Sequence, residues 1–327
     1  MSLALLINVE RWPLREPFAI AREVTRDVFV LTLTLNDANW RSGRGEAAGV
    51  DYAGDTLERM VDQLRDVAHL LDADLPSEAL AALLPPGGAR NAIDCALWDL
   101  RAKTSGVPAW RAAGLAKPRT MITAVTIGLG DAEQTRRRAH ALRAAPLIKV
   151  KVARRPLDAV RIVRKEAPAA RIVVDANEAW TPALLERSLP GLLEAGVELI
   201  EQPLPRGEDR ALAGLASPIP IAADESCTDR RSLDALQGLY QAINIKLDKA
   251  GGLSEGLALA REARARGFEI MVGNMCGSSL AMAPAFLVAQ LARWADLDGP
   301  LLQQGDRPHA MRYAEGRVHP PKPALWG

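Results

Sequence analysis

The sequence predicts an α/β protein in which a small α+β domain precedes a larger region of parallel strands. Two observations carry this prediction: strand-like apolar runs alternate with amphipathic helical stretches from about Met121 onward, and at least five of those runs end in a charged residue. Such alternation is typical of parallel sheets covered by helices. Charged strand ends favour a closed barrel over an open, doubly wound sheet, because the strand ends of a barrel converge on one mouth.

The first domain is expected to extend to about residue 118. Residues 3–10 (LALLINVE) and 27–37 (DVFVLTLTLND) alternate or carry β-branched runs, which predicts antiparallel strands. A polar connection is predicted at 17–27 and a glycine-rich loop at 43–55. Helical periodicity then predicts helices at 56–74, 77–85 and 89–106.

The second region repeats a strand and then a helix. Its predicted strands are 120–129, 146–152, 171–176, 197–202, 219–224, 242–247 and 268–274. A short eighth strand near 293–297 would close a barrel. The tail lacks this period and is expected to return to the first domain. The predicted divisions are therefore 1–118 for the α+β domain, 119–300 for the barrel and 301–327 for the returning segment.

Composition argues against several classes of function. The chain carries 41 basic and 40 acidic residues and no basic stripe with aromatics, so nucleic acid is not an expected partner. Charges interrupt the apolar stretches before the roughly 18 residues of a membrane span, and the early Glu10 and Arg11 indicate a strand, not a signal peptide. Cys95, Cys227 and Cys276 form no paired motif, which fits a reducing cytoplasm. No histidine lies at a charged strand end, so a zinc site or a serine–histidine triad is poorly supported.

Three carboxylates end consecutive predicted strands: Asp175 in VVDAN, Glu201 in LIEQP and Asp224 in AADES. Successive charges from Lys151 to Lys246 lie 22 to 26 residues apart, about one strand–helix unit. A single acidic residue at a strand end is more often a loop or helix cap. Three in register can instead surround a hard cation such as Mg²⁺ and leave positions for a substrate carboxylate.

Lysines flank these carboxylates. Lys149 and Lys151 lie two apart on one strand and point to the same face, and the apolar PLI before them disfavours the alternative of surface lysines. Mutual repulsion is expected to lower a lysine pKa from about 10.4 toward the roughly 7 to 8 that suits a base. Lys246 ends a strand nearly opposite Lys151, so a substrate carbon between them can lose a proton to one and gain one from the other. A cation on the substrate carboxylate would stabilise the resulting enediolate.

Together these motifs resemble the muconate-lactonizing subgroup of the enolase superfamily. KVK, VVDANEAW, LIEQPLP, IAADES and INIKLDKAGGL stand in the order of that family, after NAIDCALWDLRAK in the first domain. The resemblance covers essentially the whole chain. It implies a (β/α)7β TIM-like barrel with an α+β capping domain formed by the N-terminal region and the C-terminal tail. The site residues that it implies are the ligands of one Mg²⁺ per subunit, Asp175, Glu201 and Asp224, the acid/base pair Lys151 and Lys246, and the assisting Lys149.

Within that subgroup, Asp296 and Asp298 in ADLDGP resemble the DxD signature of dipeptide epimerases. Two carboxylates that face one way at the end of a strand can hold the α-ammonium group of a dipeptide. Helix capping or loop solvation around Gly299-Pro300 is the alternative. The subgroup also contains cycloisomerases, o-succinylbenzoate synthases and N-acylamino acid racemases, and the aspartate pair favours a dipeptide epimerase over these.

Three further residues are candidates for substrate contacts. The resemblance to L-Ala-D/L-Glu epimerases places an arginine that binds a carboxylate in the first loop, and Arg22 in AIAREVTRD is the candidate. A solvated loop arginine is the alternative. Thr123 in TMITAVTIGL and Ser278 in MVGNMCGSSLAM are the other two.

These observations predict a cytoplasmic, Mg²⁺-dependent isomerase that epimerises the C-terminal residue of a dipeptide by a two-base 1,1-proton transfer. L-Ala-D/L-Glu is the best candidate, and recycling of murein peptides is the pathway that it would serve. The alternatives are another carboxylate-enolising enzyme of the subgroup and a metal-dependent binding protein, which would not need lysines on both sides. A dipeptide is the expected partner, neither nucleic acid nor a membrane is expected, and a homo-oligomer is left open.

Overall fold

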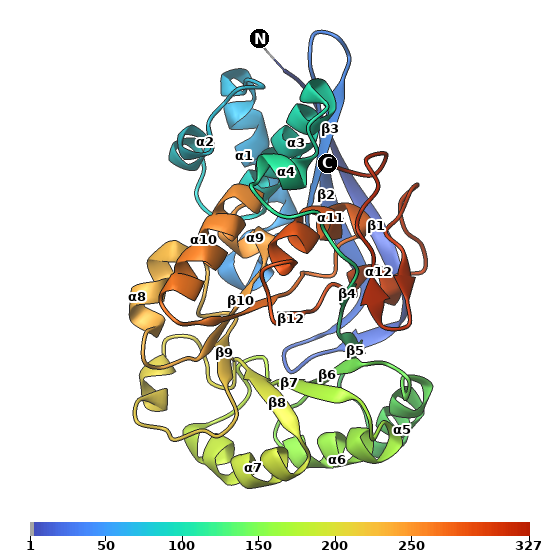
Figure 1. Ribbon diagram of the computed structural model, residues 1–327, viewed down its shortest axis with the longest axis vertical. Coiled ribbons are helices and arrows are strands. Elements are labelled where there is room, and N and C mark those ends of the chain that lie inside the picture. Colours follow the sequence, from blue (N-terminus) through green and yellow to red (C-terminus); the bar gives the residue numbers. More distant parts are fainter. Residues whose placement is uncertain (1–2) are drawn as a thin grey trace.

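In the computed structural model, which describes residues 3–327, an antiparallel sheet lies beside a curled sheet of parallel strands (Figure 1). The antiparallel sheet has the order β1-β2-β3, with β1 at Ala4–Ala19, β2 at Val24–Asn36 and β3 at Ser42–Ala47. The two long strands β1 and β2 form a hairpin whose turn reaches down to the ends of the parallel strands (Figure 1). This hairpin carries the loop with Arg22 toward the second sheet.

Helix α3 (Gly88–Ser105) packs directly on β3. A Cβ on Gly43 would lie 2.2 Å from the carbonyl oxygen of Ala96, and one on Gly45 would lie 2.1 Å from that of Ala92. A side chain at either position would push the helix away from the sheet. The expected loop at 43–55 is therefore wrong for its first five residues, because these glycines serve close packing of a strand. The other helices of this part are η1 (Asp51–Ala53), α1 (Leu57–Val67), η2 (Ala68–Leu70), α2 (Ser77–Leu83) and α4 (Ala109–Ala112).

The parallel sheet has eight strands in sequence order, from β5 to β12. They are β5 (Val125–Ile127), β6 (Leu147–Lys151), β7 (Arg171–Asp175), β8 (Val197–Glu201), β9 (Ile221–Ala223), β10 (Ala242–Ile245), β11 (Glu269–Val272) and β12 (Trp294–Ala295). The last of these confirms the short strand expected near 293–297. The two edges of the sheet meet at one hydrogen bond, in which the Ala124 amide donates to the Ala295 carbonyl at 2.7 Å.

A ring of buried apolar side chains fills the inside of the curled sheet. It takes one residue from, or next to, each strand: Ala124, Leu147, Val173, Leu199, Ala222, Ala242, Met271 and Trp294. A second, larger core lies between the outside of the strands and the helices that cover them. The interior of the curl is therefore packed at this level, and open space lies only beyond it.

Helices cover the outside of the curled sheet unevenly. Those of ten residues or more are α5 (Ala132–Ala141), α6 (Pro156–Glu166), α7 (Pro182–Glu194), α10 (Leu253–Ala265) and α11 (Ser279–Ala289). After β8 and β9 the connections contain only the short η3 (Asp209–Leu212), η4 (Arg230–Ser232) and α8 (Leu233–Leu236), so the expected regular alternation is wrong there. The short α9 (Leu247–Ala250) and α12 (Gly299–Leu302) follow β10 and β12.

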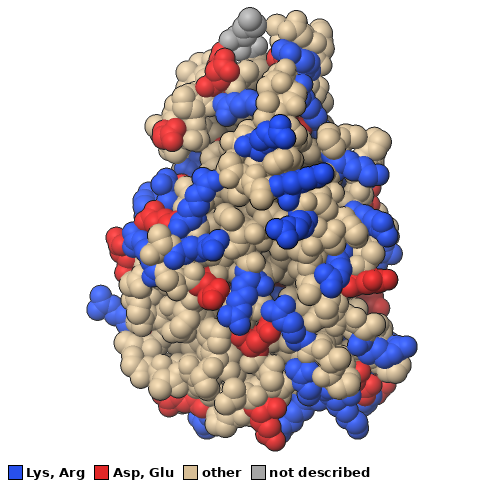
Figure 2. Space-filling model, viewed as in Figure 1, with Lys and Arg blue, Asp and Glu red and all other residues tan. Residues whose placement is uncertain are grey.

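The predicted strand at 120–129 is divided between two sheets. Its first part, β4 (Met121–Ile122), joins β13 (Tyr313–Ala314) and β14 (Arg317–Val318) of the C-terminal segment, and its second part is β5. No helix within residues 3–327 is long and apolar enough to cross a membrane. The face in Figure 2 carries both basic and acidic side chains.

Candidate active site

Charged side chains follow the apolar ring at one end of the parallel strands. Each strand places its next inward side chain two residues after the ring residue, because side chains alternate along a strand. Two of these eight positions hold Thr126 and Gly273, and the other six hold Lys149, Asp175, Glu201, Asp224, Asn244 and Asp296. The structure therefore brings the predicted carboxylates and Lys149 together from five strands.

Lys149 lies at the centre of this group and is 1% exposed. Its Nζ is 2.7 Å from Glu201 Oε2, 3.0 Å from Asp175 Oδ2 and 2.7 Å from Asp296 Oδ2. Burial alone would lower the pKa of Lys149, but the attraction of these carboxylates raises it well above its usual range. The pKa lowering expected from a neighbouring ammonium is therefore wrong for Lys149, because three carboxylates lie within 3.0 Å of its Nζ.

The two predicted acid/base lysines enter one cavity from different strands. Lys151 Nζ lies 2.6 Å from Asp175 Oδ2, and Lys246 Nζ lies 2.7 Å from Asp224 Oδ2. Both line a cavity of about 940 Å³, together with Asn177 and residues of the first part of the chain. Burial opposes a charge on Lys246, but Asp224 outweighs it and raises the pKa of this lysine. Each lysine is thus held by a carboxylate at the edge of the cavity.

The three predicted metal ligands are all almost completely buried. Burial and the nearby Asp175 raise the pKa of Glu201 to about 8, against the attraction of Lys149. Glu201 Oε2 makes no hydrogen bond, although it forms an ion pair with Lys149. Within residues 3–327 no group of three acidic, histidine or cysteine side chains is arranged so that it could hold a metal ion. Instead, a lysine ammonium lies within 3.0 Å of each of the three carboxylates. Carboxylate oxygens clustered at one place are the ligands that a hard cation such as Mg²⁺ prefers, so these three residues fit such an ion once the ammonium groups give way.

Two polar neighbours of these carboxylates, Lys249 and Asn244, were not predicted from the sequence. Lys249 Nζ lies 2.6 Å from Asp224 Oδ1 and donates to the Asn244 carbonyl at 3.0 Å. The Asn244 side chain donates to Glu201 Oε1 at 2.7 Å. Asn244 stands two residues before Lys246, so the alternation of the strand could have found it. Lys249 could have been found only by knowing that a helical turn follows Lys246.

The aspartate pair lies beside this group and is buried. Asp296 Oδ2 pairs with Lys149, and Asp298 Oδ2 accepts the Thr126 amide at 2.7 Å. Burial and the adjacent Asp296 raise the pKa of Asp298 to about 7. Neither aspartate is among the described residues that line the cavity. In this structure both carboxylates are engaged by other parts of the chain.

Two of the predicted substrate contacts do not reach the cavity. Thr123 is fully buried between β4 and β5, and its hydroxyl accepts the Leu297 amide at 2.9 Å. Ser278 is also fully buried, and its hydroxyl caps α11 and donates to Glu46. In this structure each hydroxyl is engaged by the packing of the chain, and a role of Thr123 or Ser278 in binding substrate stays a prediction.

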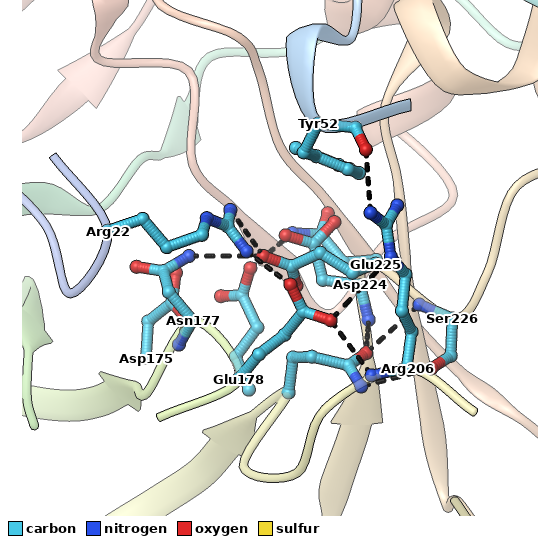
Figure 3. Close-up of polar contacts among 12 residues, drawn as sticks. Arg22, Tyr52, Asp175, Asn177, Glu178, Arg206, Asp224, Glu225 and Ser226 are labelled. Atoms are coloured by element: carbon cyan, nitrogen blue, oxygen red, sulfur yellow. Dashed lines mark hydrogen bonds and ion pairs between the residues drawn. The ribbon is translucent and has the colours of Figure 1, made fainter. Parts of the chain in front are cut away.

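Arg22 does reach the cavity, from the turn between β1 and β2. Its guanidinium forms ion pairs with Glu178 and, at 2.8 Å, with Glu225, and it lies over the Tyr52 ring at 4.9 Å (Figure 3). The side chain is 33% exposed, but its guanidinium is paired with carboxylates of the chain. Sequence reasoning could not supply these partners, because Glu178 lies 156 residues away in the chain.

Comparisons with known proteins agree with this architecture. Residues 3–114 match the family model for the N-terminal domain of mandelate racemase / muconate lactonizing enzyme, and residues 130–324 match the enolase C-terminal domain-like model. The chain is 48% identical over 246 residues to an N-acetyl-D-glutamate racemase from Pseudoalteromonas sp, covering 75% of this chain and 78% of that one. It is 39% identical over 313 residues to the L-Ala-D/L-Glu epimerase of Escherichia coli strain K12, covering 95% and 97%.

A solved structure is similar over nearly the full length. It is an enolase family member from Agrobacterium tumefaciens with homology to dipeptide epimerases, and it contains sodium and L-Ala-L-Glu. The TM-score is 0.96 and the identity 41%, with 99% of this chain and 100% of the other covered. The chain therefore belongs to the mandelate racemase / muconate lactonizing enzyme family of the enolase superfamily.

Proposed function

We propose that this protein is a Mg²⁺-dependent dipeptide epimerase that inverts the α-carbon of the C-terminal residue, with L-Ala-D/L-Glu as its substrate pair. The observation that carries the proposal is the pair Lys151 and Lys246, which enter one cavity from different strands, each beside a buried carboxylate. A binding protein would not need both. The relatives that act on L-Ala-Glu and N-acetylglutamate support the same class of reaction.

Asp175, Glu201 and Asp224 would hold the ion, since their oxygens lie together at the end of the sheet. When bound, Mg²⁺ stabilises the negative charge that develops on the substrate carboxylate and takes up the charge of these ligands. With the charge of Asp224 met by the ion, the attraction that raises the pKa of Lys246 would weaken, and Lys246 in its neutral form could accept a proton. Lys151 removes the α-proton of one epimer, and Lys246 removes that of the other. In each direction the lysine that has not removed the proton donates its own to the opposite face of the α-carbon.

Two groups are proposed to set the substrate. Asp296 and Asp298 would hold the α-ammonium group of the dipeptide, and Arg22 would bind the side-chain carboxylate of its second residue. Arg22 already lies at the cavity, which supports its role. The aspartates would have to exchange their present partners, Lys149 and the Thr126 amide, for the ammonium group.

The wider architecture is part of the proposal. We infer that the curled sheet is a closed (β/α)7β barrel, because one hydrogen bond joins its edges and every strand contributes to the interior ring. A capping domain of residues 1–118, a barrel of 119–300 and a returning segment of 301–327 agree with the separate sheets. Free thiols at all three cysteines support a cytoplasmic enzyme, for which recycling of murein peptides is a suitable role.

Racemisation of N-acylated glutamate is the second candidate. Two observations favour it: the relative with 48% identity acts on N-acetyl-D-glutamate, and the aspartate pair is engaged within the chain. An N-acylated substrate has no ammonium group to place near these aspartates. The proton transfer, the cation and the role of Arg22 would be the same for both substrates.

Proton exchange in D₂O tests the proposed function. Purified protein with Mg²⁺ should incorporate deuterium at the glutamate α-carbon of L-Ala-L-Glu, followed by ¹H NMR. Because the two lysines serve opposite faces, Lys246→Ala should abolish epimerisation of both epimers yet keep exchange from one of them. Exchange into neither dipeptides nor N-acetylglutamate would rule out the proposal.

A further inference from the structure

Glu178 bridges two arginines from different parts of the molecule. Its Oε2 pairs with Arg22 of the β1–β2 turn, and its Oε1 accepts the backbone amide of Arg206 at 2.8 Å (Figure 3). The Arg206 guanidinium lies 3.9 Å from the same oxygen. Glu178 is therefore shared between the arginine that faces the cavity and a second arginine beside it.

Tyr52 lies between the two guanidinium groups. The Arg22 guanidinium lies 4.9 Å and that of Arg206 4.8 Å from the centroid of the Tyr52 ring, and Arg206 also donates to the Tyr52 carbonyl at 2.6 Å. Stacking on an aromatic face keeps a guanidinium in place while its other edge changes partner. Both arginines can thus stay where they are when Glu178 moves between them.

The backbone around Glu178 is held in an uncommon conformation. Asn177 and Glu178 have φ values of 43° and 67°, in the left-handed region, and the Glu178 amide donates to the Gln202 carbonyl at 2.9 Å. Residues other than glycine adopt this conformation at a cost and keep it only where the surrounding structure fixes them. The position of Glu178 is thus set by the ends of β7 and β8 and not by a free loop.

The two carboxylates on Arg22 differ in how easily they can leave. The side chain of Glu225 is 1% exposed, whereas that of Glu178 is 14% exposed and has Arg206 as a second partner. Separating Glu225 from Arg22 would leave a buried charge unpaired, which is costly. Glu178 keeps a cation beside it when it leaves Arg22. A carboxylate that arrives from the cavity would therefore replace Glu178.

We infer that Glu178 is a specificity-determining residue: it occupies, on Arg22, the place that the side-chain carboxylate of the substrate takes, and it passes to Arg206 when that substrate binds. The inference rests on the proposed function and deepens it. It assigns the cavity to substrates whose reacting residue carries an acidic side chain. It also makes Arg206, which does not face the reacting atoms, a positioning residue for the exchange.

Two substitutions should move specificity in opposite directions. Glu178→Gln removes the competing charge, so the preference for L-Ala-L-Glu over L-Ala-L-Gln should rise about tenfold. Arg206→Gln removes the second partner of Glu178 and leaves that carboxylate on Arg22, so the same preference should fall several-fold. Glu198→Gln is the control, because Glu198 also pairs with an arginine, Arg171, but at the start of β8. That variant should keep the wild-type ratio.

The ratio is to be measured twice, as kcat/KM for α-proton exchange and as the ratio of dissociation constants from calorimetry. Opposite shifts in the two variants support the inference. The inference would be overturned if the preference for L-Ala-L-Glu over L-Ala-L-Gln were unchanged in both variants or shifted in the same direction in both. It would also be overturned if the wild-type protein bound neither dipeptide. Wild-type protein that binds the acidic dipeptide without exchanging its α-proton would refute the proposed function alone, while the binding ratios still decide the role of Glu178.

Discussion

Asp224 illustrates how the charges at the strand ends depend on one another. One of its oxygens lies 2.7 Å from Lys246 Nζ, and the other lies 2.6 Å from Lys249 Nζ. Burial opposes ionisation, but the two ammonium groups hold the pKa of Asp224 well below its usual value. A buried carboxylate stays charged only with such partners. Asp224 can therefore give up one lysine to a cation while the second keeps it ionised.

Substitution of Asp298 separates the two candidate substrates. Asp298→Asn keeps an oxygen for the Thr126 amide but removes the charge proposed to hold an α-ammonium. A hydrogen bond to a charged group contributes about 1.5 to 3 kcal/mol, so kcat/KM for L-Ala-L-Glu should fall roughly 10- to 100-fold. N-acetyl-L-glutamate has no ammonium and should lose little. Deuterium exchange with both substrates measures the difference, and equal losses would show that Asp298 has no role in reading the amino group.

At the scale of elements, alternation along strands made the strand ends predictable. Every second residue of a strand points the same way, so Lys149 of β6 and Asp175 of β7 both point to the inside of the curled sheet. In the structure Lys149 Nζ lies 3.0 Å from Asp175 Oδ2. The catalytic and ligand roles of these residues stay predictions. Contacts between elements could not be predicted from the sequence, because no local pattern links Arg22 to Glu225. Likewise, the glycines of β3 predicted a loop because their packing partner, α3, is invisible in a local pattern.

Asp248 ties the short helix after β10 to the segment that leads to Tyr52. It lies in α9, and its Oδ1 accepts the amides of Ala48 and Gly49 at 3.0 and 3.1 Å. Burial, with a smaller effect of Asp55, raises the pKa of Asp248 from 3.8 to about 7, although the amides oppose the shift. The joint between the two parts of the molecule therefore contains a carboxyl group that titrates near neutral pH.

Asp248→Asn should make stability less dependent on pH. Between about pH 4 and 7 the folded chain keeps a proton on Asp248 that the unfolded chain releases, so this group stabilises the fold below that window and loses its contribution as the pH rises. At about 1.4 kcal/mol per pKa unit, wild type should lose roughly 2 to 3 kcal/mol of stability through this group between pH 5 and pH 8. The free energy of unfolding of the variant, taken relative to that of wild type, should therefore be higher at pH 8 than at pH 5 by that amount. Urea denaturation at both pH values measures it, with the exposed Asp158→Asn as the control. An equal difference at both pH values would contradict the pKa assignment.

At the scale of the whole molecule, the C-terminal segment joins the two sheets. The sequence indicated its return to the first domain, because it lacks the barrel period, but not where it attaches. Arg307 pairs with Glu46 of β3 at 2.6 Å, and Arg44 donates to the Leu325 carbonyl at 2.5 Å. These partners lie more than 250 residues away in the chain, so only the assembled fold could reveal them.

We expect Trp326 to be the residue through which the C-terminal segment stabilises both the first domain and the parallel-strand region. Its side chain is 1% exposed within the large core, and its indole nitrogen donates to the Cys95 carbonyl of α3 at 3.0 Å. Trp326→Ala would leave a cavity where helices of both parts meet, at a cost of about 3 to 5 kcal/mol. Urea unfolding followed by far-ultraviolet circular dichroism should therefore show a clearly lower midpoint. Trp40→Ala, in which an 80% exposed indole is removed, should shift it little. Similar midpoints for the two variants would mean that the two parts are held together without the C-terminal segment.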